Sequence, residues 1–329
     1  MSDGIAAELR ATVHRVVAED PLVSRDRLRD LGWPELLAEE PEVAVAALFE
    51  SLGETRGTGD ALDEVVLAVL YGGETDTGTA VLHPVGETGA VGRPVAGDLV
   101  EVDGMLLDRA GAPSRYVLPV ADGTAVAWAS LDAATTGLTV TPVRGLDATL
   151  GWSRVTGRIP RAALEPGASG ADGWRRALTA ARRAKAHELL GMASRMLVLP
   201  VEHARVRTQF GQPIGSFQAV KHLLASVAVV VEAGRSAVGA AWREQDAVSA
   251  DLACAVSARA HAEAVRGGHQ VLGAIGFTWE HEFHRYVRRG RSLDCLYGEW
   301  RALQRGIGAA IAASGDVPRA AVLVGTEAS

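Results

Sequence analysis

Two short segments combine polar side chains with helix-breaking residues in a way that suits the binding of an anion. The first spans residues 207–218 and contains Gly211, which ends a helix, and Ser216, which can cap the next one. Arg207 and Gln209 are therefore expected at a corner between two helices, with their donors pointing outward. A guanidinium in that position can bind a diphosphate through paired, charge-assisted hydrogen bonds. A solvent-exposed helix end without a ligand would carry the same residues.

The second segment spans residues 269–281 and follows a long helical stretch. Gln270 lies in the last turn of that helix, and Gly273 and Gly276 come directly after it. Glycine lets a ligand or a partner approach the backbone closely. A glycine that only caps the helix C-terminus is the alternative interpretation.

Other catalytic or metal-binding patterns are weak. His281 and His284 are three residues apart at a helix start, but no third ligand accompanies them, so no metal site is predicted. The two cysteines, Cys254 and Cys295, are too few for a disulfide framework or a zinc site. No Gly-x-Ser-x-Gly motif is present, so the sequence gives no sign of a serine hydrolase of the α/β-hydrolase type.

The charge is unevenly distributed along the chain. The net charge is −7, from 33 lysine and arginine residues against 40 aspartate and glutamate residues. Residues 1–160 hold 12 basic against 25 acidic side chains, whereas residues 161–329 hold 21 against 15. A basic second half suits a phosphate-bearing small molecule, although solvated helix faces would give the same asymmetry. The mixed signs and the acidic total argue against a nucleic-acid partner.

The chain has no apolar run of about 20 residues, the length that a membrane helix needs, and its first residues do not resemble a signal peptide. We therefore expect a cytoplasmic protein without a membrane span.

Hydrophobic spacing predicts three zones. Residues 1–78 show apolar positions at helical spacing, and Asp60 is placed to cap the last predicted helix. Residues 79–165 alternate β-prone runs with turns and predict a small antiparallel β-domain, with hairpin signals at Asp103-Gly104 and Asp122-Gly123. Residues 166–329 predict long helices with short connections, as in an antiparallel four-helix bundle. The predicted helices are 5–17, 25–31, 42–52, 61–70, 173–199, 216–245, 247–272 and a fourth bundle segment through 283–291 and 303–313; the predicted strands are 100–107, 115–120, 125–129 and 138–143.

The two segments together resemble the C-terminal signatures of the acyl-CoA dehydrogenase family. The match is carried by the run from Arg207 through Phe210 to Gln218 and by the run from Gln270 through Gly273 to Glu280. It covers the C-terminal zone, is weaker over the N-terminal helices and is weakest in the β-zone. The resemblance implies a mostly α fold with N-terminal helices, a reduced antiparallel β-domain and a C-terminal four-helix bundle.

The resemblance also implies a cofactor. In that family the two runs reach across a subunit interface to the diphosphate and ADP part of a neighbour's FAD. By position, Arg207, Gln209 and Phe210 would contact the dinucleotide, and Gln270 and the backbone at Gly273 would line its other side.

The family's catalytic base is not found where the resemblance would place it. Members carry a glutamate in one of two positions, and the gapless match puts Tyr297 in one and Ala181 in the other. A tyrosine, with an ordinary pKa near 10, is a poor base at neutral pH. A shifted register could bring Glu299 or Asp294 into that role.

The family's flavin-ring segment is also not found between residues 73 and 100. The chain thus resembles the shorter, non-catalytic subunit of the α2β2 acyl-CoA dehydrogenases of bacterial steroid side-chain degradation. This resemblance implies a longer paralogue as partner, which would carry the base and bind most of the acyl-CoA. The alternatives are a self-sufficient dehydrogenase with a displaced base and a flavin-free scaffold protein of the same fold.

Overall fold

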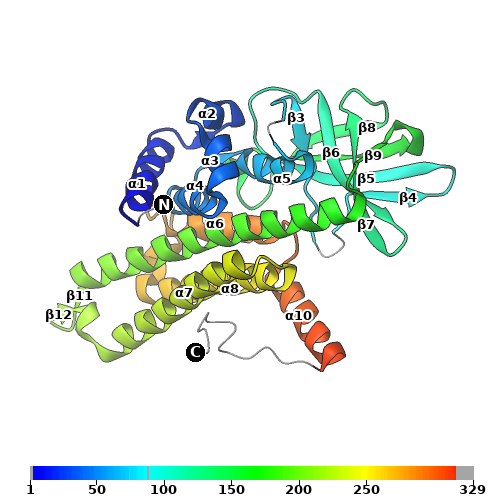
Figure 1. Ribbon diagram of the computed structural model, residues 1–329. Helices are drawn as coiled ribbons and strands as arrows, with labels where there is room; N and C mark the ends of the chain where they lie inside the picture. Colours follow the sequence, from blue (N-terminus) through cyan, green and yellow to red (C-terminus); the bar gives the residue numbers. More distant parts are fainter. Residues whose placement is uncertain (1–2, 74, 87–88, 316–329) are drawn as a thin grey trace.

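The computed structural model describes residues 3–73, 75–86 and 89–315 (Figure 1). Helices come first, and a two-stranded parallel pairing of β1 (Leu22–Val23) with β2 (Thr58–Gly59) lies among them. The N-terminal helices are α1 (Asp3–Glu19), α2 (Arg25–Asp30), α3 (Trp33–Glu39), α4 (Pro41–Thr55) and α5 (Ala61–Tyr71). The sequence did not predict α3. Pro34 stands in its first turn, where a proline is tolerated because that N–H has no partner in the helix.

An eight-stranded sheet follows, with the order β10-β7-β6-β4-β5-β9-β8 and β3 paired to β6. The expectation of a purely antiparallel sheet is wrong, because β3 and β4 both pair with β6 in parallel. They occupy successive stretches of one edge of β6, at residues 115–117 and 120. The strands are β3 (Thr79–Val81), β4 (Gly92–Val95), β5 (Leu99–Leu106), β6 (Arg115–Asp122), β7 (Ala125–Asp132), β8 (Leu138–Pro142), β9 (Ser153–Pro160) and β10 (Glu165–Pro166).

The two hairpin signals have different outcomes. The β6–β7 hairpin turns directly after Asp122, with Gly123 at a φ of 59°, as predicted. Asp103-Gly104, by contrast, lies inside β5. A Cβ at Gly104 would lie 2.7 Å from the Val91 side chain, so this glycine permits close packing within the sheet rather than a turn.

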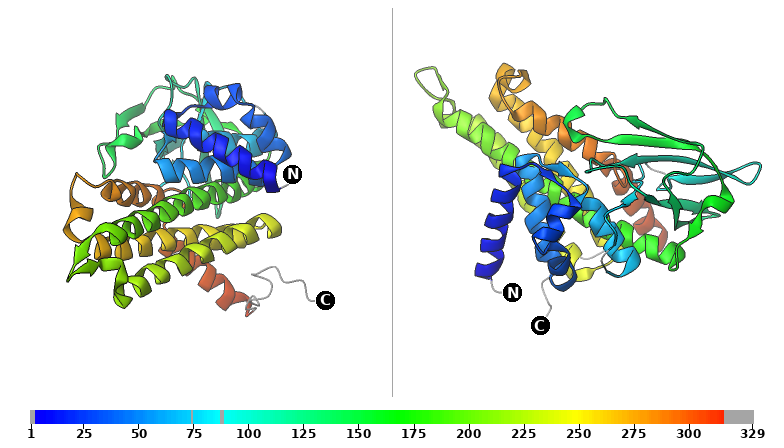
Figure 2. Two further views of the ribbon diagram at one scale, coloured as in Figure 1. Left: turned by 90° about the vertical axis from the view of Figure 1, so that its left-hand side faces the viewer. Right: turned by 90° about the horizontal axis from the view of Figure 1, so that it is seen from above.

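The C-terminal helices α6, α7 and α8 run side by side in alternating directions (Figures 1 and 2). The fourth long helix that was predicted is broken into α9 and α10, because Tyr297 and Gly298 adopt left-handed φ values of 57° and 101°. Ser216 does not cap α7; it ends a short 3₁₀ turn, and Phe217 takes the N-cap position. The helices are α6 (Gly170–Val206), α7 (Gln218–Glu244), α8 (Ala247–Leu272), α9 (Phe283–Asp294) and α10 (Trp300–Ser314).

Two glycines let α4 pack against α6 with the backbones in direct contact. A Cβ on Gly53 would lie 2.1 Å from the Glu188 carbonyl oxygen, and a Cβ on Gly191 would lie 2.3 Å from the Glu50 carbonyl oxygen. The N-terminal helices and the bundle therefore share one continuous apolar core, which includes Leu48, Phe49, Leu189 and Met192.

Within the described residues, α7 alone has the length and apolar composition that could cross a membrane. Only 28% of its most apolar window is buried inside this chain.

Replacing Gly191 by alanine should destabilise the fold, because the added methyl group collides with the Glu50 carbonyl on α4. We expect the free energy of unfolding to fall by about 1–3 kcal/mol, the usual cost of overpacking. The matched control is Gly306→Ala on α10, where a Cβ meets nothing within 4 Å. That change should be neutral or stabilising, since alanine favours a helix over glycine. Thermal unfolding followed by circular dichroism measures both; equal midpoints for the two variants would contradict the close contact.

Candidate functional site

Arg207 lies where α6 ends. Its backbone N–H still donates to the His203 carbonyl at 2.9 Å, but its φ and ψ of −70° and 116° turn the chain out of the helix. The side chain is exposed and makes no hydrogen bond or ion pair with any residue that the structure describes. The guanidinium is therefore available to a group from outside the chain, as the sequence predicts.

A small hairpin follows, formed by β11 (Thr208–Gln209) and β12 (Gln212–Pro213). Its turn residues Phe210 and Gly211 have φ values of 52° and 81°, the left-handed pair that a two-residue type I′ turn requires. Phe210 is 92% exposed, and its ring meets the Phe217 ring edge-on at 6.1 Å. The Gln209 amide donates locally to the Thr208 carbonyl at 2.8 Å. The hairpin thus presents an aromatic ring to the outside in a backbone conformation that is costly for phenylalanine.

The second predicted segment follows α8. Gln270 is exposed, and Gly273 has a φ of 64° and a ψ of −142°, a combination that only glycine adopts readily. A Cβ at Gly273 would meet nothing within 4 Å, so the space beside this backbone is open. Phe277 stacks on His269 with ring centres 4.0 Å apart. Trp279 is 74% exposed, and the Arg288 guanidinium lies over it at 4.7 Å.

The two segments share one end of the bundle, because α6 and α8 both end there and α7 begins there (Figures 1 and 2). Burial lowers the pKa of His203, and the nearby charges of His281 and Arg207 lower it further. Arg207 and His281, one from each segment, therefore both lie near His203. This end of the bundle favours an anion such as a diphosphate.

Tyr297, in the first position expected for a catalytic base, is enclosed in a polar network. It is 1% exposed, and its hydroxyl lies 2.5 Å from His83 Nδ1, while His83 Nε2 lies 2.6 Å from Asp63 Oδ1. An ionised Asp63 can only accept, so a neutral His83 would carry its proton on Nε2 and accept from the phenol at Nδ1. Burial and the Asp63 charge raise the pKa of Tyr297 well above its ordinary value. The hydroxyl is thus a donor and not a base.

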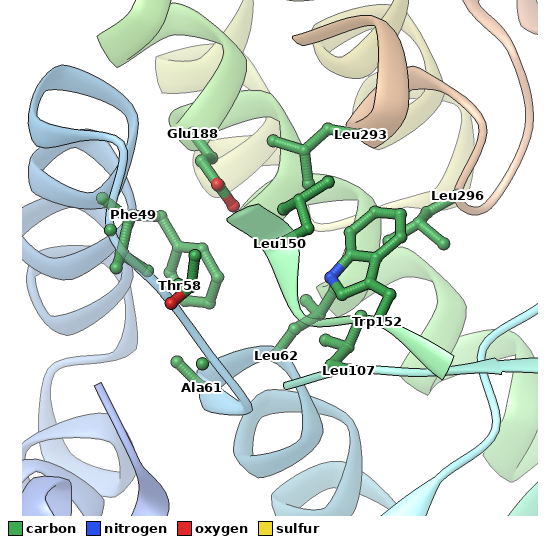
Figure 3. Close-up of a pocket in the computed structure, with 13 residues that line it drawn as sticks. Phe49, Thr58, Ala61, Leu62, Leu107, Leu150, Trp152, Glu188, Leu293 and Leu296 are labelled. Carbon is green, nitrogen blue, oxygen red and sulfur yellow. The ribbon is translucent and has the colours of Figure 1, made fainter. Parts of the chain in front are cut away.

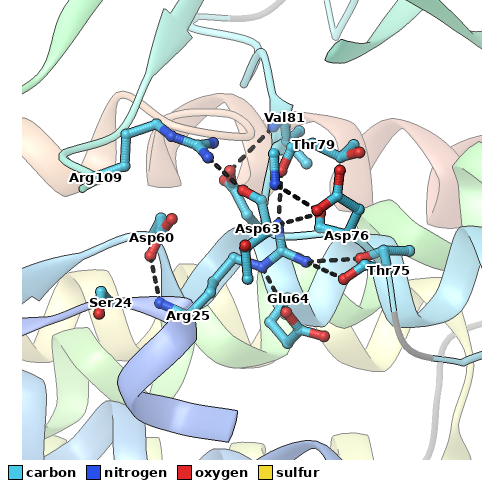
Figure 4. Close-up of polar contacts among 12 residues, drawn as sticks. Ser24, Arg25, Asp60, Asp63, Glu64, Thr75, Asp76, Thr79, Val81 and Arg109 are labelled. Atoms are coloured by element: carbon cyan, nitrogen blue, oxygen red, sulfur yellow. Dashed lines mark hydrogen bonds and ion pairs between the residues drawn. The ribbon is translucent and has the colours of Figure 1, made fainter. Parts of the chain in front are cut away.

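The network continues through α5 to α2 and β3 (Figure 4). Arg25 Nε lies 2.5 Å from Glu64 Oε2, and Arg25 Nη1 donates to the Thr79 carbonyl at 2.6 Å. Asp60 occupies the N-cap position of α5, but the prediction that its side chain caps the helix is wrong. Asp60 Oδ1 accepts instead from the Arg25 backbone N–H at 2.9 Å. Burial and the Asp63 charge raise the pKa of Asp60 to about 6. Sequence reasoning missed this network, since its hydrogen-bonded pairs are 20 to 214 residues apart in the sequence.

Ala181, in the second position expected for a base, is fully buried on α6. One turn further along, Lys185 Nζ donates to the carbonyl oxygens of Asp294, Leu296 and Gly298 at 2.9, 2.7 and 2.9 Å. All three protons of the ammonium are used, and the segment around Tyr297 is fixed to α6.

Neither candidate for a displaced base lies in a water-excluded cleft with room for a substrate. Asp294 Oδ1 accepts from the Trp300 N–H at 3.2 Å and lies 3.6 Å from Lys185 Nζ. Glu299 has a side chain that is 48% exposed and lies 3.7 Å from Arg301. The Asp294 carboxylate is therefore engaged in contacts that stabilise the start of α10, and the Glu299 carboxylate is partly solvated.

The junction between the sheet and the helices holds a cavity of about 30 Å³ (Figure 3). It is lined by apolar side chains that include Phe49, Leu150 and Trp152. This space holds about one water molecule, whereas enclosed cofactor sites are usually several hundred Å³. The residues at the bundle end therefore fit the diphosphate part of FAD, but this junction does not fit a flavin ring.

Glu188 extends its carboxyl group into the same cavity (Figure 3). Its oxygens make no hydrogen bond with any described residue. Burial raises the pKa of Glu188 to about 7, and the charge of Arg289 opposes this effect.

His281 and His284 serve local structure. The Phe283 N–H donates to His281 Nδ1 at 3.1 Å, and the His284 ring lies edge-on to Trp279 at 4.7 Å. In the described part of the chain, no three histidine, cysteine, aspartate or glutamate side chains are grouped closely enough to hold a metal ion.

Comparison with known proteins identifies a family model for the C-terminal helices and relatives for part of the chain. Residues 169–311 match the family model described as the C-terminal domain of acyl-CoA dehydrogenase. Acyl-CoA dehydrogenase FadE34 of Mycobacterium tuberculosis is 37% identical over 204 residues, which are 59% of this chain and 27% of that protein. Acyl-CoA dehydrogenase IpdE2 of the same organism is 42% identical over 104 residues, 32% of this chain and 33% of that protein. The matches thus span about a quarter to a third of these relatives.

Solved structures match over nearly the whole chain. The ChsE4–ChsE5 complex from Mycobacterium tuberculosis has a TM-score of 0.71 at 21% identity and covers 97% of this chain and 99% of that one. A variant of the Tcur3481–Tcur3483 steroid ACAD has a TM-score of 0.72 at 20% identity and covers 95% of this chain and 99% of that one. PigA in complex with FAD has a TM-score of 0.72 at 14% identity, covering 96% and 99%. At these identities the likeness shows the fold, and it confirms the predicted fold class.

The raised pKa of Glu188 predicts how stability depends on pH. Between its ordinary value of 4.5 and about 7, the folded chain holds a proton that the unfolded chain has lost. The free energy of unfolding should therefore fall as the pH rises through this window, by up to about 3 kcal/mol. Glu188→Gln should remove the loss and be more stable than the wild type at pH 8, but not at pH 4.5.

Urea unfolding at both pH values measures this difference. Glu202→Gln on the same helix is the control, because that side chain is 56% exposed. An equal pH response in the wild type and Glu188→Gln would show that Glu188 is ionised without cost.

Proposed function

The chain belongs to the acyl-CoA dehydrogenase family, and on that premise we propose that it is a non-catalytic subunit of a heteromeric, FAD-dependent acyl-CoA dehydrogenase. The observation that carries the proposal is Tyr297, which stands where a family base is expected and whose hydroxyl is hydrogen-bonded to His83 inside a closed network. Removal of an α-proton needs a carboxylate over the substrate carbon. A buried phenol whose pKa is raised cannot supply that step.

The role proposed for this chain is to complete the FAD site of its partner. Arg207, Gln209, Phe210, Gln270 and Gly273 are the residues that would contact the dinucleotide. The Arg207 side chain would bind the diphosphate, and the open backbone at Gly273 would let the cofactor approach. FAD, when bound, accepts the hydride that leaves the substrate. The flavin ring, the base and most of the acyl-CoA would be held by the partner.

The proposed partner is a longer acyl-CoA dehydrogenase paralogue in an α2β2 assembly. The likeness to the ChsE4–ChsE5 complex supports a heteromer, and the likeness to the Tcur3481–Tcur3483 steroid ACAD supports a steroid-derived acyl-CoA as substrate. The largely uncovered apolar window of α7 supports burial of this helix in an assembly. We propose a cytoplasmic location for the complex.

The chain expressed alone should contain almost no FAD, because it lacks an enclosed place for the flavin ring. Co-expressed with its partner, it should purify in a yellow complex with one FAD per αβ pair. Absorbance at 450 nm relative to protein concentration measures the content. Stoichiometric FAD in the isolated chain, together with turnover of an acyl-CoA, would instead identify a self-sufficient dehydrogenase.

Arg207→Ala should weaken FAD binding to the apo-complex by at least about tenfold, because a charge-assisted hydrogen bond contributes roughly 1.5–3 kcal/mol. Arg207→Lys should recover only part of the affinity, since an ammonium cannot reproduce the guanidinium fork. Turnover at saturating FAD should stay near that of the wild type. The control is Arg243→Ala, an exposed arginine at the opposite end of the bundle. Unchanged FAD affinity in Arg207→Ala would remove the cofactor role from this chain.

A further inference from the structure

A groove of about 580 Å³ lies between α3, α4, α5, α6 and the end of α7. It is lined mainly by apolar side chains, among them Leu37, Val45, Val65 and Val69. Its volume is in the range of sites that bind small organic molecules. It meets the network around Tyr297 only at Glu64, whose carboxylate is paired with Arg25.

Arg183 on α6 places a cation at one end of this groove. Its Nε is buried without a hydrogen-bond partner, and no ion pair joins Arg183 to any described residue. Burial lowers the pKa of Arg183, while the charge of Asp246 partly opposes that effect. The guanidinium is therefore incompletely satisfied by the chain itself.

The neighbours of Arg183 hold it in place without neutralising it. The guanidinium lies over the Trp242 ring at 5.0 Å. Trp242 Nε1 donates to His187 Nε2 at 2.9 Å, and His187 Nδ1 lies 2.9 Å from Glu50 Oε1. This chain of contacts fixes the aromatic face on which the cation rests.

The carboxylates that line the groove do not cancel this charge. Glu64 is already paired with Arg25 at 2.5 Å. Glu35 is exposed at the mouth of the groove, where water screens it. The charge left without a partner inside the groove is positive.

We propose that this groove binds a carboxylic acid with an apolar body. The carboxylate would pair with Arg183, and the body would lie along Leu37, Val65 and Val69. A guanidinium matches a carboxylate through two parallel hydrogen bonds, and the pairing gains strength from partial burial. The apolar lining would remove the rest of the ligand from water.

The test uses the full chain purified with its partner, and isothermal titration calorimetry with dodecanoate below its micellar concentration. Dodecan-1-ol has the same apolar body without the charge and should bind at least about tenfold more weakly. Arg183→Gln should weaken dodecanoate binding by at least about tenfold and should leave the affinity for dodecan-1-ol nearly unchanged. Ala68→Trp, which fills the groove, should abolish binding of both.

The matched control is Arg176→Gln, an exposed arginine on the same helix, which should bind dodecanoate as the wild type does. Thermal unfolding of each variant confirms that it is folded. Equal binding of dodecanoate and dodecan-1-ol, or unchanged dodecanoate binding in Arg183→Gln, would overturn the proposal. So would the absence of dodecanoate binding in the complex, as when a segment of the partner fills the groove. The titration reads neither FAD binding nor turnover, so its failure would leave the proposed function untouched.

Discussion

The Lys185 ammonium is buried beneath the break between α9 and α10, where it donates to three carbonyl oxygens. A buried ammonium is costly unless its protons are satisfied, and here each one has an acceptor within 2.9 Å. The carbonyls of Asp294, Leu296 and Gly298 can converge on one atom only if the helix stops. The left-handed conformations of Tyr297 and Gly298 follow from that requirement. The contact therefore determines both where the bundle's fourth helix breaks and which side chain points inward.

The inward side chain is Tyr297, and it closes the centre of the molecule. Its hydroxyl joins His83 and Asp63, and the adjoining Arg25 and Glu64 pair extends the network across α2, α5 and β3. Such networks are stabilising when every member is satisfied and costly when one is removed. A substrate could enter this region only by breaking several of these bonds together. The centre of the chain thus acts as a structural junction.

Sequence periodicity was sufficient for elements whose pattern is local. The helix at Ala247–Leu272 has the predicted bounds, and Asp122-Gly123 forms the predicted hairpin, because apolar spacing and turn chemistry both act over a few residues. The hairpin predicted at Asp103-Gly104 is absent, because the packing of Gly104 against Val91 outweighs the turn preference of this pair. The broken fourth helix was not predictable either. Its cause is Lys185, more than a hundred residues away in the sequence.

The residues of the candidate site also differ in whether they could be identified from the sequence. Arg207 and Gln270 could be selected from the sequence because they stand in contiguous runs that resemble a family signature. The structure adds their exposure, but whether they contact FAD is still a prediction. His83 and Asp63 could not be selected from the sequence, since their role depends on the fold bringing Tyr297 beside them. Arg183 could not be identified from the sequence for a related reason. A lone arginine on a helix is interpreted as a solvated side chain until the groove around it is known.

The cations of this chain differ in whether the chain itself supplies their hydrogen-bond and ion-pair partners. This difference, more than the residue type, separates structural cations from those that could bind a ligand. Lys185 and Arg25 are buried and fully engaged, so their charge is used in holding the fold together. Arg207 and Arg183 have no ion-pair partner among the described residues, one at the exposed end of the bundle and one in an apolar groove. Arg183 is partly withdrawn from water without an anion, which costs free energy in the isolated chain. An external anion would remove that cost, and at the exposed Arg207 it would add a charge-assisted hydrogen bond, so affinity for anions is expected at these two places and not at the closed centre.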